Sequence, residues 1–240
     1  MKRYNAKYLL GDIHGHWSVI LNHVESNPNN NACYIQVGDF GIGFCDIGVE
    51  ISKLSILNDA LKSKESDLYV IRGNHDNPIW FKSDQLGEAS LSNIFFVPDY
   101  TVLNIDSENI LFIGGAISID RNPRRKYKKE FDSWWEDEVV EFRFDKIKEF
   151  RNIDRLICHT CPDFCEPIRF SQIVYDYASG DSSLLSDLRE ERKNMTKLVT
   201  ELMENNKLKS FVYGHFHNNY RFYHNECEFL GLGVDQFMSF

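Results

Sequence analysis

A chain of 240 residues with 42% hydrophobic content is long enough to bury a sizeable core but short for two full domains, so we expect one domain over residues 1–240. Its 36 acidic residues outnumber its 27 Lys and Arg, and the resulting formal charge of -9 disfavours bulk binding to nucleic acid. The N-terminus lacks the apolar stretch of a signal peptide, and no segment reaches the roughly 20 apolar residues that a membrane span requires. With six scattered cysteines, these features predict a soluble, cytoplasmic protein.

The first third of the chain alternates strand-like and helix-like patterns. Short β-rich runs at 8–10, 34–37 and 68–71 each end at a loop that contains glycine. Between them, residues 17–24 and 47–61 carry apolar side chains at the spacing of a buried helical face. This β-α-β-α-β order predicts a largely parallel sheet.

The second half is richer in strands. Runs at 94–97, 102–105 and 110–113 are close enough for hairpin connections, and further strands are expected at 211–213, 220–223 and 227–230. A long helix with an apolar stripe is expected between residues 184 and 203. The pattern predicts an α/β fold in which two mixed β-sheets pack as a sandwich flanked by α-helices.

Residues with metal-binding or acid–base chemistry lie almost entirely where predicted strands end, which is where open α/β sheets place their active sites. The segments are GDIHG at 11–15, GD at 38–39, GNHD at 73–76, CHT at 158–160 and GHFH at 214–217. One residue separates Asp12 from His14 and His215 from His217, so on an extended backbone each pair points to one side and can share an ion. Glycine at positions 11, 38, 73 and 214 allows sharp turns beside them.

In this order, the five segments resemble the motifs of the calcineurin-like metallophosphoesterases, and the resemblance extends over residues 11–217. It implies that Asp12, His14 and His217 bind one metal ion, that Asn74, His159 and His215 bind a second, and that Asp39 bridges them. Such a set of oxygen and nitrogen ligands suits two divalent ions, with manganese favoured and iron, zinc or nickel as alternatives.

The resemblance also implies the chemistry, namely hydrolysis of phosphate mono- or diesters by a hydroxide that bridges two metal ions. His75 would lie beside the metals and stabilise the transition state or protonate the leaving oxygen, while Asp76 would fix its tautomer. Arg72 would hold non-bridging phosphate oxygens. The expected substrate is a phosphorylated small molecule, a nucleotide or a phosphoprotein.

The segment at about 118–142 is expected to form a lid or insert. The residues of GGAxSxDR at 114–121 and the Trp134–Trp135 pair resemble a bacterial and phage-encoded subgroup of these phosphoesterases. We expect Arg121, Arg124 and Arg125 to hold substrate phosphate. The two tryptophans would form a lid, stack on a base or serve as a packing plug.

The motifs of this chain differ in part from those of the Ser/Thr phosphoprotein phosphatases. Those enzymes usually continue the second aspartate loop as Asp-Arg-Gly, whereas here Asp39 is followed by Phe40 and Gly41. The segment 72–76 is similar to their third motif, with Asp76 in place of the usual Glu. The phosphoprotein and nucleotide alternatives therefore both stay open.

Other patterns have less specific interpretations. The cysteines at 158, 161 and 165 lack the second pair of a zinc site and are better explained as small semi-buried residues that shape the loop of His159. His16, His23 and His224 are interpreted as structural, and the charged run 189–193 as a solvated helix face. A catalytically silent metal-binding scaffold is the alternative function, disfavoured because every ligand position carries a suitable residue.

Overall fold

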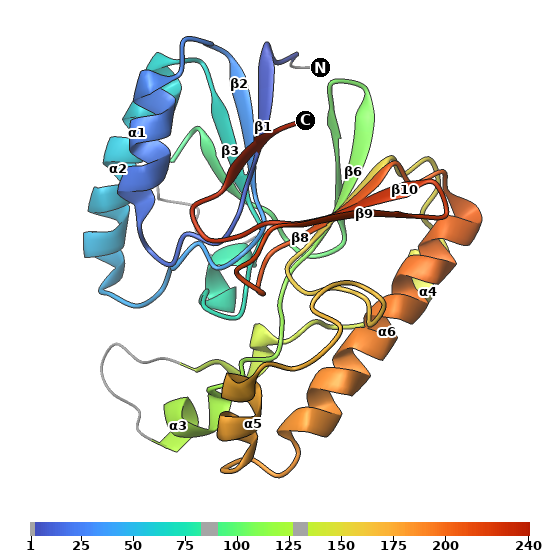
Figure 1. Cartoon of the computed structure of the whole chain (residues 1–240). Helices are drawn as coiled ribbons and strands as arrows, with labels where there is room; N and C mark the ends of the chain where they lie inside the picture. The colour runs from blue at the N-terminus through green and yellow to red at the C-terminus, as the bar shows by residue number, and fades with distance from the viewer. Residues whose placement is uncertain (1–2, 83–90, 127–133) are drawn as a thin grey trace.

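Two β-sheets packed face to face form the centre of the structure, a computed structural model that describes residues 3–82, 91–126 and 134–240 (Figure 1). The first sheet has the order β11-β1-β2-β3-β4 and consists of β1 (Ala6–Leu10), β2 (Ala32–Gln36), β3 (Asp67–Val70), β4 (Ile94–Phe96) and β11 (Phe237–Ser239). Strands β1 to β4 are parallel, and β11 runs antiparallel to β1.

The second sheet has the order β5-β6-β7-β8-β10-β9. Its strands are β5 (Thr101–Ile105), β6 (Glu108–Ile113), β7 (Arg155–Cys158), β8 (Ser210–Tyr213), β9 (Tyr220–His224) and β10 (Cys227–Gly231). The central strands β6, β7, β8 and β10 are parallel, whereas β5 and β9 pair antiparallel at the edges. Two mixed sheets with flanking helices confirm the predicted fold class.

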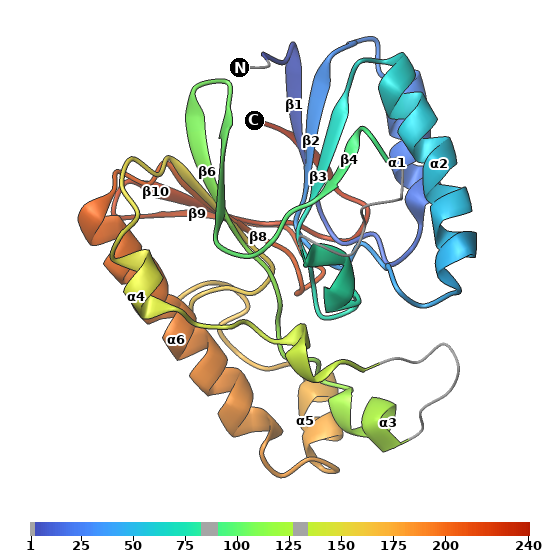
Figure 2. The same cartoon turned by 180° about the vertical axis from the view of Figure 1, so that it is seen from behind.

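Helices cover the outer faces of both sheets, as the two opposite views show (Figures 1 and 2). On the first sheet lie α1 (Trp17–Ser26) and α2 (Ile47–Ser63), and along the second lie α4 (Phe144–Ile147) and α6 (Leu184–Asn205). The short helices α3 (Arg121–Lys126) and α5 (Gln172–Ala178) lie together at one end of α6. A 3-10 turn at Pro78–Phe81 packs against the core beneath α1 and α2, and another lies at Glu136–Glu138. Within the described residues, no helix is both long and apolar enough to cross a bilayer.

Neighbouring residues of one strand serve different layers of this core. Leu9 packs between the two sheets, whereas Leu10 packs beneath α1 and α2, because successive side chains of a strand point to opposite faces. Burial on both faces explains why β2 is buried along its whole length.

Two expectations about the elements need correction. The charged run 189–193 is not wholly a solvated face, because Glu191 and Arg192 are buried on α6. Strand β11 and helix α5 had no counterpart among the predicted elements. The first is a three-residue strand, and the second buries none of its side chains, so neither produces a strong periodic pattern.

Candidate metal centre

The residues predicted to bind metal follow five strands that end near one another. Asp12 follows β1, Asp39 follows β2, and Asn74 follows β3, while His159 and His215 follow β7 and β8. Parallel pairing places the carboxyl ends of the strands at the same edge of each sheet. The face-to-face packing of the sheets brings both edges together, so residues from positions 12 to 217 share one site.

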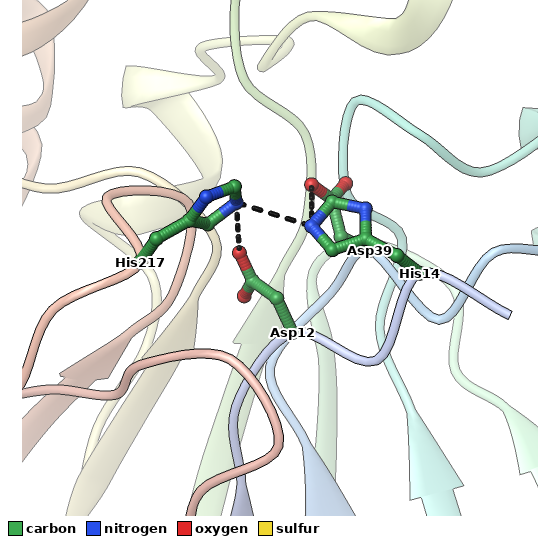
Figure 3. A group of neighbouring side chains, drawn as sticks. All are labelled: Asp12, His14, Asp39 and His217. Carbon is green, nitrogen blue, oxygen red and sulfur yellow. Dashed lines mark hydrogen bonds and ion pairs between the residues drawn. The ribbon is translucent and has the colours of Figure 1, made fainter. Parts of the chain in front are cut away.

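The first group of possible metal ligands contains Asp12, His14, Asp39 and His217 (Figure 3). The Nε2 atoms of His14 and His217 are 3.1 Å apart, and His217 Nε2 is 3.3 Å from Asp12 Oδ2. All four side chains offer a ligand atom within 4.8 Å of the others. Two imidazole nitrogens and two carboxylates that converge in this way form a set that a divalent transition-metal ion accepts.

The second group contains Asp39, His159 and His215. His159 Nε2 lies 3.2 Å from Asp39 Oδ1 and 3.0 Å from Asn74 Oδ1. His159 Nδ1 lies 2.8 Å from the Val37 carbonyl, so this nitrogen carries the hydrogen and donates it. In the neutral ring, Nε2 therefore carries a lone pair that faces the oxygens of Asp39 and Asn74. A proton or a metal ion between Nε2 and these oxygens would make the arrangement favourable.

Asp39 lies between the two groups and presents one oxygen to each. Its Oδ1 faces His159, while its Oδ2 is 3.8 Å from His14 Nε2. The backbone N–H of His75 donates to Asp39 Oδ1 over 2.7 Å and thereby fixes the carboxylate. The His215 N–H does the same for Asp12, with contacts of 3.2 and 3.0 Å to its two oxygens.

Burial and opposite charges shift the pKa values at this site in different directions. Burial alone would lower the pKa of His159, but the Asp39 carboxylate raises it to about 9. The pKa of Asp39 is held well below its ordinary value, since the charges of His159 and His75 outweigh the effect of burial. Burial holds the pKa of His215 well below its ordinary value, which leaves that imidazole neutral and able to bind a metal.

The backbone at the site is not extended, and here the sequence expectation was wrong. His14, Asp39, His215 and His217 have φ values of 47°, 56°, 68° and 57°, all in the left-handed region. Asp12 and His14 belong to one group because the chain turns tightly after β1, not because alternate residues of a strand share a face. His215 and His217 belong to different groups, so the expectation that this pair shares an ion is wrong. Non-glycine residues rarely adopt left-handed φ values, so several of them at one site indicate backbone strain that the surrounding structure maintains.

Two glycines allow the loops to approach this closely. A Cβ atom on Gly38, which has a φ of 97°, would lie 2.5 Å from His159 Nδ1. A Cβ atom on Gly73 would lie 2.1 Å from Asp39 Oδ1. Larger residues at either position would displace a candidate metal ligand.

Asp76 has a different partner from the one expected. Its Oδ1 accepts from the N–H groups of Gly41 and Ile42, and its Oδ2 accepts from those of Phe40 and Gly73. The described residues show no hydrogen bond between Asp76 and the His75 ring. Asp76 thus ties the loop after β2 to the loop after β3, and the expected control of the His75 tautomer is corrected to this structural role.

Arg72 also has partners other than the expected one. Its guanidinium donates to Asp99 Oδ2 over 2.7 and 2.9 Å, and to the carbonyls of Asp137, Glu138 and Val139 over 2.9 to 3.0 Å. All three nitrogens are used within the fold, and the side chain is 7% exposed. The expected hold on phosphate is therefore corrected to an anchor for residues 137–139.

The three arginines of the expected lid make internal contacts. Arg121 is paired with Asp181 and Asp187, which joins α3 to the start of α6. Arg124 is buried and donates to Ser118 Oγ over 2.7 Å, while the Arg125 guanidinium lies 3.8 Å from the centre of the Trp134 ring. Residues 127–133 of this segment lie outside the described residues, so the lid itself stays a prediction.

The hydrogen bonds of Ser118 connect Arg124 to the metal site. Asn74 Nδ2 donates to Ser118 Oγ over 2.9 Å, so the amide oxygen of Asn74 points to the opposite side, toward His159. This places Arg124 behind a candidate metal ligand instead of in contact with phosphate.

A cavity of about 480 Å³ opens from the metal centre, and its walls include residues that the sequence did not reveal. Among the ligand candidates, Asp39, Asn74, His215 and His217 line it, together with His75, Arg169, Asn218 and Tyr220. Arg169 is exposed and has no hydrogen bond or ion pair to other described residues. No motif surrounds it in the sequence, so only the fold shows that this arginine borders the site. Neither Trp134 nor Trp135 is among the described residues that line the cavity.

The cysteines near His159 do not form a metal group among the described residues. Cys158, Cys161 and Cys165 are fully buried and free. Arg192 donates to the carbonyls of Pro162 and Cys165, and this holds the loop that follows His159. These contacts favour the structural interpretation of the three thiols.

Comparison with known proteins identifies the family of this chain. The family model for calcineurin-like phosphoesterases matches residues 8–219, so the chain belongs to this family, whose members are divalent-metal hydrolases. The protein TT1561 of Thermus thermophilus shares 9% identity and a TM-score of 0.53, with 98% of each chain covered. Phosphopantetheinyl hydrolase (PptH) from Mycobacterium tuberculosis shares 13% identity and a TM-score of 0.48, with 98% of this chain and 92% of that chain covered. No curated protein sequence matches the chain.

Proposed function

We propose that this protein is a phosphoesterase with two divalent metal ions, which hydrolyses phosphate mono- or diesters. The position of Asp39 carries the proposal, because one carboxylate presents its two oxygens to two separate groups of histidines. One ion would be held by Asp12, His14 and His217, the other by Asn74, His159 and His215, with Asp39 between them. Manganese is the first candidate, and iron, zinc and nickel also suit these ligands.

The residues present fit such a pair of ions. The lone pair on His159 Nε2 faces oxygen acceptors, and two imidazole nitrogens meet 3.1 Å apart in the other group. When bound, the ions would supply the Lewis-acid charge that activates water and neutralises the phosphate. The bonds from backbone N–H groups to Asp12 and Asp39 hold both carboxylates in place before metal arrives.

His75 is the residue proposed to move a proton. Its ring lines the cavity, lies 5.4 Å from the ring of His14, and has no hydrogen bond to other described residues. Its backbone N–H is fixed on Asp39, so the ring is held beside the metal groups without belonging to either. From there it can protonate the leaving oxygen of the ester.

Arg169 replaces Arg72 as the proposed contact to the substrate anion. It lines the same cavity as His75 and His215 and is exposed on the loop before α5. A guanidinium at this position can form a bidentate contact with phosphate oxygens.

The free state of all six cysteines supports a cytoplasmic location.

The experiment that tests the function compares hydrolysis of p-nitrophenyl phosphate, bis-p-nitrophenyl phosphate, a phosphopeptide and 2′,3′-cyclic nucleotides with added Mn²⁺. We expect metal-dependent turnover by the wild type, a loss in His75→Ala and Asp39→Asn, and no loss in the control His224→Ala, which belongs to neither metal group. The preferred ester would assign the substrate class. Bound metal without turnover of any ester would favour the catalytically silent scaffold.

A further inference from the structure

The cavity at the metal centre is lined by two chemically different sets of residues. One set is Asp39, Asn74 and histidines of the site. The other set is apolar and consists of Ile119, Phe170, Ile173, Val174, Tyr177 and Leu188, and all of these except Ile173 belong to one hydrophobic cluster. A group that extends from a phosphate at the metals toward this cluster meets an apolar wall.

Helix α5 contributes half of the wall residues and exposes its side chains. Ile173, Val174 and Tyr177 all come from this helix, and their spacing places them on one face. None of the side chains of α5 is buried, and Ile173 is 54% exposed. A short helix that exposes apolar side chains into a cavity gains stability when an apolar ligand covers them.

The contacts of Arg121 and Asn122 hold α5 and α6 near the site. Arg121 joins α3 to Asp181 and Asp187, and the Asn122 amide donates to the carbonyl of Gly180, just after α5. The wall is therefore attached to the segment that also carries Arg124, behind the metal ligand Asn74.

We propose that this wall is a recognition subsite for an apolar group, alkyl or aryl, carried by the phosphate ester. The inference rests on the proposed function, because the metal centre anchors the phosphate from which the apolar group extends. A cavity of about 480 Å³ has the size of a small-molecule site. Esters of small polar alcohols leave the wall exposed to water, so the subsite selects against them.

The test uses alkylphosphonates as non-hydrolysable inhibitors of whichever p-nitrophenyl ester the Mn²⁺-loaded enzyme hydrolyses. Methyl-, butyl-, hexyl- and octylphosphonate carry the same charged group, so any trend in the inhibition constant reports the apolar chain. We expect the inhibition constant to fall by up to about fourfold per buried methylene until the cavity is filled. A constant that does not change from methyl to octyl would overturn the proposal.

Two isoleucines give a matched pair of variants. Ile173→Ser removes an exposed apolar side chain from the wall, and Ile168→Ser makes the same change at a residue that is 63% exposed and lies outside this cavity. Because both are exposed, both variants should fold. We expect Ile173→Ser to raise the hexylphosphonate constant about tenfold and leave the methylphosphonate constant unchanged, while Ile168→Ser changes neither.

The outcomes separate this proposal from the proposed function. If no ester is hydrolysed with metal, the phosphoesterase itself fails, whatever the phosphonates do. If esters are hydrolysed but Ile173→Ser and Ile168→Ser behave alike, the enzyme stands and the apolar subsite is wrong.

Discussion

Replacement of Arg72 by lysine distinguishes an anchor in the fold from a contact with substrate. The guanidinium donates two hydrogen bonds to Asp99 and three to the carbonyls of residues 137–139. A lysine ammonium has three hydrogens and lacks the planar fork, so at least two of these five bonds are lost. At about 1.5–3 kcal/mol for each bond to a charged group, Arg72→Lys should lower the free energy of unfolding by about 3 kcal/mol or more.

The assay is urea unfolding followed by fluorescence, with KM measured on the same preparations. Arg221→Lys is the matched control, since Arg221 is 63% exposed and its ion-pair partner among the described residues is Glu228, so we expect a much smaller loss of stability. We expect Arg72→Lys to be less stable with little change in KM. Unchanged stability with a tenfold higher KM would refute the argument and would support a contact between Arg72 and the substrate.

Three further predictions concern the site and its surroundings. Arg169→Met should raise KM for the preferred ester about tenfold with a smaller effect on kcat. A tenfold fall in kcat with an unchanged KM would contradict a binding role. Ser118→Ala should weaken metal binding about tenfold by calorimetry, because Asn74 loses the partner that orients its amide, whereas unchanged affinity would exclude that role. Burial raises the pKa of Glu138 from 4.5 to about 7. Between these two pH values the folded chain keeps a proton on Glu138 that the unfolded chain has lost. The free energy of unfolding should therefore fall by up to about 3 kcal/mol as pH rises across this interval. Glu138→Gln should reduce that fall by the same amount in denaturation measured between pH 4.5 and 8, and a fall of unchanged size would assign it to other groups.

The core strands were predictable because their apolar runs end in glycine-containing loops. Runs at 34–37 and 68–71 correspond to β2 and β3 within one or two residues at each end. The candidate ligand residues lie in the same loops, since each motif comes directly after a strand. What periodicity could not show was how the loops turn, and the left-handed backbone at His14 and His217 is a product of tertiary contacts.

The roles of the arginines were the least predictable part. Arg72 and Arg124 lie beside motif residues in sequence or in space, yet their partners are Asp99, Ser118 and backbone carbonyls from distant segments. Arg169 has no motif of its own and reaches the cavity only because the loop before α5 folds across the strand ends. Long-range contacts of this kind leave no periodic pattern in the sequence.

The most direct test of the two-metal centre is the metal content measured together with the rate. Metal-free protein is titrated with Mn²⁺, bound ions are counted by mass spectrometry, and hydrolysis of the preferred ester is followed at each point. The proposed bridging role of Asp39 predicts that activity saturates at two ions per chain, and that Asp39→Asn binds fewer and is inactive. Full activity with one ion per chain, or full activity in Asp39→Asn, would contradict it.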